Sequence, residues 1–142
     1  VYDETNEEAN YNHLISAKFA KYEIIHYADY ITLVVNKYSF DYKTIITTLG
    51  SDVYVFDKTT GKLYNNDELL SKFSVNKDDI KGKIETYLND KNLVSEENKI
   101  NVEQTISNNT KYNLYVDKLG RLVISILVKA EKSDYNDIIV LS

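Results

Sequence analysis

The sequence predicts an α+β domain in which two or three helices pack on one face of a mostly antiparallel sheet. Apolar and polar residues alternate near both ends of the chain, asparagine-led helix caps stand between these regions, and the connections are short. The 142 residues, 43% of them hydrophobic, are enough for one domain with its own core. We therefore expect a single domain over residues 12–142.

Residues 1–11 are expected to form a flexible acidic lead-in. They contain four carboxylates and almost no bulky aliphatic side chains, so they have too little apolar surface to pack into the core. Because the chain begins with Val1 and contains no Met, we expect it to be a mature or excised fragment. No apolar run approaches 18 residues, so any export signal or membrane anchor is expected outside this sequence, with no membrane insertion here.

Three strands are predicted in the first part of the chain. Apolar side chains occupy odd positions up to Phe19 and even positions from Tyr22, which predicts a long strand with a bulge near residues 20–21. Residues 31–35 predict a second strand, antiparallel to the first. A third is predicted over 44–56, with a break at residues 50–51.

A tight turn and three helices are predicted next. Asp57 can bond its own backbone two residues on, and Gly61 can adopt the positive φ that closes such a turn. Each helix is expected after an asparagine that has an acidic or amide side chain three residues later, the pattern of a capping box. The caps are Asn65, Asn76 and Asn101, and the predicted helices span 67–73, 77–89 and 101–108.

The C-terminal part returns to β-structure. Alternation over 112–116 and 122–128, joined by the glycine-containing loop 117–120, predicts a hairpin. A last strand is predicted over 138–141. Strands, then helices, then strands with short connections favour one antiparallel layer made from both ends of the chain.

No catalytic, cofactor-binding or metal-binding residues are predicted. The chain has no Cys, and its two histidines lie in no nucleophile or metalloprotease pattern. Asp57–Glu68 spans the twelve positions of a calcium loop, but Lys62 stands where the sixth-position glycine is required. A hydrolase using Asp or Glu remains an alternative, to be revived by a deep pocket that holds two carboxylates with raised pKa values. The net charge of −5 argues against nucleic acid and anionic membranes as partners.

The 13 tyrosines are the one surface feature with a possible binding role. If the early strands pair as predicted, six of them gather on or near one sheet face, where flat amphipathic rings suit protein or glycan recognition. The alternative is that these tyrosines are simply good strand formers. The expected binding surface consists of Tyr22, Tyr27, Tyr30, Tyr38, Tyr42 and Tyr54.

Several segments carry a family resemblance. Val53–Leu63 reads VYVFDKTTGKL and is followed by NDELL at residues 66–70, and the chain continues to YNLYVD at 112–117 and GRLVI at 120–124. Over about residues 14–140 the chain resembles exported Gram-positive domains of unknown function, typified by the extracytoplasmic region of the RsiV anti-sigma factor and the non-catalytic region of the peptidoglycan deacetylase PdaC. Many members carry a GGAH element after the second strand, where this chain has Tyr38–Lys43.

The resemblance implies an exported α+β domain, extracellular or at the cell surface, with its membrane or wall anchor outside this segment. It implies no catalytic residue and no cofactor. RsiV-type members bind lysozyme, and this activity cannot be carried over to residues that the chain lacks. We expect a non-catalytic binding or sensing module that recognises a protein, such as lysozyme, or peptidoglycan. The alternative is a structural spacer or accessory domain of a larger wall protein.

Overall fold

The computed structural model describes residues 17–41, 43 and 45–142, and it has the predicted α+β fold. Six strands form antiparallel pairs, and helices occupy the middle of the chain. The lead-in predicted over residues 1–11 lies outside the described residues.

The first sheet consists of β1 (Ala17–Tyr27), β2 (Tyr30–Phe40) and β3 (Ile46–Asp57), in the order β1-β2-β3. The bulge predicted in the first strand is wrong, because β1 pairs with β2 in one unbroken register. The register shifts instead between β2 and β3, where Leu49 is the extra residue before Gly50. The break predicted at residues 50–51 is therefore a bulge in a continuous strand. The change of apolar parity in β1 reflects apolar side chains on both of its faces.

The second sheet consists of β4 (Asn113–Val116), β5 (Leu122–Val128) and β6 (Tyr135–Val140), with β5 in the middle. The predicted hairpin is β4 and β5. In the intervening turn the Asp117 carboxylate accepts hydrogen bonds from the N–H groups of Leu119 and Arg121.

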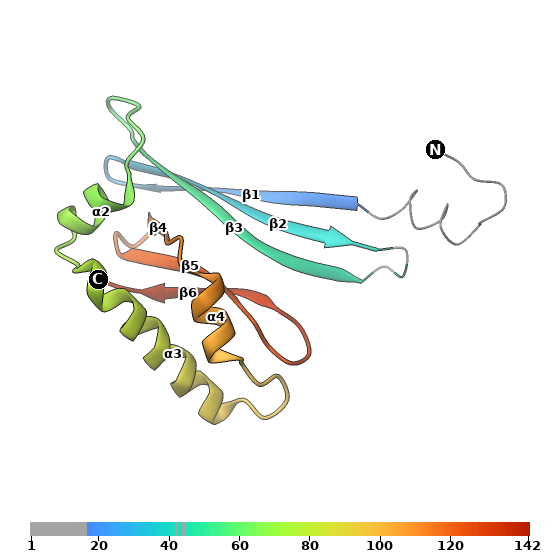
Figure 1. The fold of residues 1–142 in the computed structure, drawn as a ribbon. Coiled ribbons are helices and arrows are strands. Elements are labelled where there is room, and N and C mark those ends of the chain that lie inside the picture. The colour runs from blue at the N-terminus through green and yellow to red at the C-terminus, as the bar shows by residue number, and fades with distance from the viewer. Residues whose placement is uncertain (1–16, 42, 44) are drawn as a thin grey trace, which may run out of the picture.

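The expectation of one layer is wrong, because the strands form two sheets that stack (Figure 1). The first sheet covers one face of the second, and α3 (Ile80–Val94) and α4 (Val102–Asn108) cover the other. β5 explains this arrangement. Of its seven residues only Leu127 is not fully buried, so the strand needs a cover on both faces.

Two polar contacts and one close approach join the sheets. The Thr32 hydroxyl donates to the carbonyl of Val116 at 3.2 Å, and the Asn113 amide donates to the carbonyl of Ser51 at 2.8 Å. Gly120, at φ +78°, lies against the ring of Tyr27, whose Cζ would be 2.3 Å from an added Cβ. A side chain at position 120 would therefore have to displace Tyr27 as well as adopt a strained backbone.

The helix caps are largely as predicted. Asn65 and Glu68 form a complete capping box at the start of α2 (Asn66–Lys72), and Asn101 accepts from the N–H of Gln104 at the start of α4. The Asn76 side chain accepts a hydrogen bond from the N–H of Asp78 rather than that of Asp79. The reason is that this helical segment begins with a 3₁₀ turn, η1 (Lys77–Asp79). α3 continues from η1 to Val94, five residues beyond the predicted end.

The turn after β3 is held by the Asp57 carboxylate. Its Oδ1 accepts from the N–H groups of Thr59 and Thr60, at 2.8 and 2.9 Å, and its Oδ2 accepts from the Tyr64 hydroxyl at 2.9 Å. Gly61 has φ +72°, as predicted. The hydrogen bond from the N–H of Thr60 has the largest effect on the pKa of Asp57, and the bond from the Tyr64 hydroxyl has the second largest. Both hold this pKa below its ordinary value of 3.8.

We expect the stabilisation from Asp57 to be lost in acid. Because the pKa is lowered on folding, this stabilisation is fully present above pH 3.8 and declines as the pH falls through the folded-state pKa. The difference in unfolding free energy between the wild type and Asp57→Asn should therefore be largest near neutral pH and narrow below pH 3.8. Urea unfolding followed by circular dichroism over this range measures it. A difference that does not vary with pH would contradict the prediction.

Candidate binding surface

The candidate surface is the face of the first sheet that points away from the second. On β2, Thr32 and Val34 point toward the second sheet and are 0% and 4% exposed. Because side chains alternate along a strand, the odd-numbered residues of β2 point the other way. The outer face, as we call it, consists of Tyr22, Ile24, His26, Ile31, Leu33, Val35, Tyr54 and Phe56.

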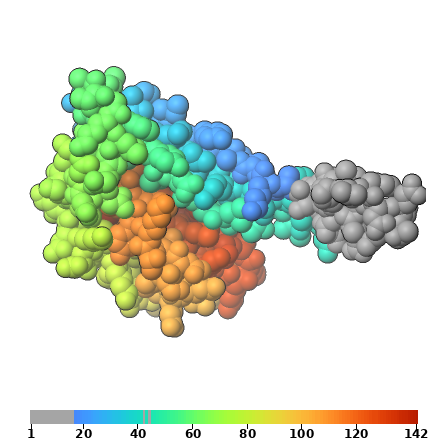
Figure 2. Space-filling model, turned by 45° about the horizontal axis from the view of Figure 1, so that its top comes forward, coloured from blue at the N-terminus to red at the C-terminus, as the bar shows by residue number. Residues whose placement is uncertain are grey.

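The register assembles the outer face into rows across the three strands. The central row is Ile24, Leu33 and Tyr54, which are direct partners on β1, β2 and β3. The neighbouring row begins with Tyr22 on β1, whose direct partner on β2 is Val35. Tyr22 is 71% exposed, Ile24 63% and Tyr54 40%. In Figure 2 the blue and cyan strands of this sheet lie at the molecular surface. Such a contiguous exposed apolar face is typical of an interaction site.

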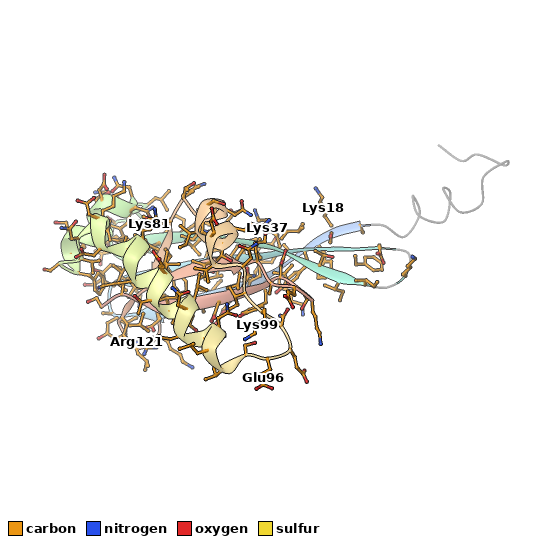
Figure 3. The ribbon with its side chains drawn as sticks, turned by 60° about the horizontal axis from the view of Figure 1, so that its bottom comes forward. Lys18, Lys37, Lys81, Glu96, Lys99 and Arg121 are labelled. Atoms are coloured by element: carbon orange, nitrogen blue, oxygen red, sulfur yellow. The ribbon has the colours of Figure 1, made fainter. Side chains whose placement is uncertain are left out.

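Charged groups lie at the margin of this face. On β2, Lys37 is the outer-face residue after Val35. Its Nζ lies 3.2 Å from Oδ2 of Asp52, which is the outer-face residue before Tyr54 on β3. Lys18 extends from the start of β1 (Figure 3). A polar margin around an apolar centre is the usual anatomy of a protein interface.

The five described tyrosines of the predicted surface share one sheet but not one face. Tyr22 and Tyr54 belong to the outer face. Tyr27 and Tyr30 are partners across the β1–β2 turn and lie on the inner face, where Tyr30 packs against Tyr64 and Phe73. Tyr38 stacks on Phe19 near the other end of the sheet, with ring centroids 5.2 Å apart. Tyr42 lies outside the described residues.

The aliphatic members of the outer face were missed by the sequence argument. Ile24, Leu33 and Val35 make up most of its centre. The signal was present, because β1 and β2 carry apolar residues at both odd and even positions, as expected for a strand that is apolar on both faces.

Structural contacts and burial account for the shifted pKa values of Tyr64, Lys91 and Tyr115. The hydrogen bond to Asp57 raises the pKa of Tyr64 to about 12, and burial raises that of Tyr115 to about 12. Burial alone would lower the pKa of Lys91, but its ion pair with Asp137 at 2.6 Å outweighs burial and raises the pKa. The hydrogen bond and burial favour the neutral phenols of Tyr64 and Tyr115, and the ion pair favours the charged amine of Lys91.

The described part of the chain holds no group of three or more His, Asp or Glu side chains that could bind a metal ion. A hollow of about 330 Å³ lies between α3, α4 and Tyr112, and its charged lining residues are Lys81 and Glu103. No described helix has the length and apolar character needed to cross a lipid bilayer.

No protein-family model matches the chain, and no curated protein matches it. The fold and the surface therefore define the protein as a small α+β domain with one exposed, largely apolar sheet face.

Proposed function

We propose that this protein is a binding module without catalytic activity, exported to a Gram-positive cell surface, which recognises a protein partner through the outer face. The row of Ile24, Leu33 and Tyr54 carries the proposal, since it is apolar and contiguous, with Ile24 and Tyr54 exposed and Leu33 half-buried between them. The aliphatic side chains favour a protein over a glycan, because sugar rings stack on aromatic rings and need polar neighbours. The net charge of −5 favours a basic partner.

Lysozyme is the first protein to test, because the RsiV-type members that the sequence resembles bind it. Binding is measured by calorimetry with lysozyme and by co-sedimentation with purified peptidoglycan. Saturable lysozyme binding supports the proposal. Binding to peptidoglycan alone would replace the protein partner with a glycan, and no binding to either would contradict the proposal for these ligands.

Ile24→Ser is expected to weaken binding of the protein partner at least tenfold. Ile24 lies in the central row, and anchor residues at the centre of an interface account for most of its affinity. Leu119→Ser is the matched control, since Leu119 is also 63% exposed but lies in the β4–β5 turn. Calorimetric titration of both variants measures the difference. Equal loss of affinity in the two variants would exclude the outer face as the site.

A further inference from the structure

A second interaction surface is the free edge of β1. β1 is the first strand of its sheet, and its only strand partner among the described residues is β2. Its eleven residues contain neither proline nor a bulge, two of the devices that normally prevent edge strands from pairing. The edge is therefore suited to adding another strand.

The hairpin determines which residues of β1 face this edge. Tyr27 and Tyr30 close a two-residue turn, so they form a hydrogen-bonded pair. Hydrogen-bonded and non-hydrogen-bonded pairs alternate along an antiparallel ladder, so the odd-numbered residues of β1 bond to β2. The even-numbered residues, from Lys18 to His26, direct their N–H and C=O groups outward.

Lys21 and Glu23 make this edge complementary to itself. They flank Tyr22, the central residue of the strand, and point to the inner face, where both are exposed. If two copies of β1 pair antiparallel about Tyr22, Lys21 of each copy lies opposite Glu23 of the other. In this register Ala17 lies opposite Tyr27, so all eleven residues are paired.

The neighbouring registers are disfavoured by charge. Moving the two-fold axis by one residue places Lys21 opposite Lys21, or Glu23 opposite Glu23. Like charges directly opposite each other destabilise an antiparallel pair, and opposite charges stabilise it. In the register centred on Tyr22, Lys21 of one copy and Glu23 of the other form a non-hydrogen-bonded pair, the kind of pair in which side chains come closest.

The second layer leaves room for this pairing. The second sheet packs beneath β3 and β2, whereas nine of the eleven β1 residues are exposed. Glu23 forms no ion pair within the described part of the chain, and Lys21 has only a cation–π contact, with Nζ 6.0 Å from the ring centre of Tyr38. Neither side chain must break an existing ion pair to reach a second copy.

We propose that two copies of this chain associate through β1, antiparallel and centred on Tyr22, to form one continuous six-stranded sheet. The two outer faces then become a single surface with the two Tyr22 side chains at its centre. A single strand pair buries less area than a standard protein interface of about 1,600 Å², so the dimer is expected to be weak and concentration-dependent. The inference does not depend on the proposed ligand.

Sedimentation velocity of the full chain tests the dimer. The wild type is expected to shift from the mass of one chain, 16.4 kDa, toward twice that mass between 10 µM and 1 mM. Glu23→Lys and Lys21→Glu should each remain monomeric at these concentrations, because every charge pair at the interface becomes repulsive. Circular dichroism checks that both variants fold.

The charge swap makes the test specific to this register. An equimolar mixture of Glu23→Lys and Lys21→Glu should form a heterodimer, because each lysine then faces a glutamate. The double variant Lys21→Glu/Glu23→Lys should dimerise with itself for the same reason. A monomeric wild type at 1 mM would overturn the proposal. So would single variants that dimerise like the wild type, or a mixture that does not associate.

Discussion

Replacing Ile124 by alanine is expected to lower the free energy of unfolding by about 3–4 kcal/mol, because the truncation leaves a cavity in the most enclosed part of the core. Ile124 is 0% exposed and lies on β5, the middle strand of the second sheet. Its strand partners are Leu114 on β4 and Ile139 on β6, both of which are also buried.

Ile138→Ala is the matched control, since it removes the same atoms from a neighbouring position of the same sheet. Ile138 is 50% exposed, so its loss should be below about 1 kcal/mol. Urea unfolding followed by circular dichroism measures both variants. Similar losses would show that β5 is not enclosed by the two layers.

The signals that could be read from the sequence are the local ones. The Asn65 box and the turn at Asp57 depend on residues two to four positions apart, so the sequence alone displays them. The number of sheets depends on pairing between distant segments. The apolar run of β5 still held a signal, because Val123 and Leu127 occupy the face that simple alternation leaves to solvent.

The binding surface was predicted by residue type, whereas strand register determines it. Tyr27 and Tyr54 both belong to the first sheet but lie on opposite faces, since each face is set by odd or even position and by strand pairing. Because Leu49 is an extra residue, the odd- and even-numbered residues exchange faces in the part of β3 that precedes this bulge. The number of tyrosines does not reveal which residues share a face. The even position of Ile24 and the odd position of Leu33 do reveal it, once the register of the β1–β2 hairpin is known.

One edge of β5 is only partly covered by a strand from the described residues. β4 begins at Asn113, which pairs with Ser125, so β5 extends beyond the reach of β4. Asn109, which ends α4, takes the place of the missing strand. Its Oδ1 accepts from the N–H of Leu127, and its Nδ2 donates to the carbonyl of the same residue, both at 2.9 Å. One asparagine side chain thus reproduces the pair of bonds that a strand residue would form.

Asn109→Ala is therefore expected to lower the free energy of unfolding by about 2–3 kcal/mol, because it leaves the N–H and carbonyl of Leu127 without these partners. Asn108→Ala is the control, since that neighbouring side chain is exposed, and its effect should stay within about 0.5 kcal/mol. Urea unfolding measures the totals, and amide hydrogen exchange locates the effect. The Leu127 amide should lose protection in Asn109→Ala and keep it in Asn108→Ala. Unchanged protection in both variants would mean that this bond pair does not hold the end of β5.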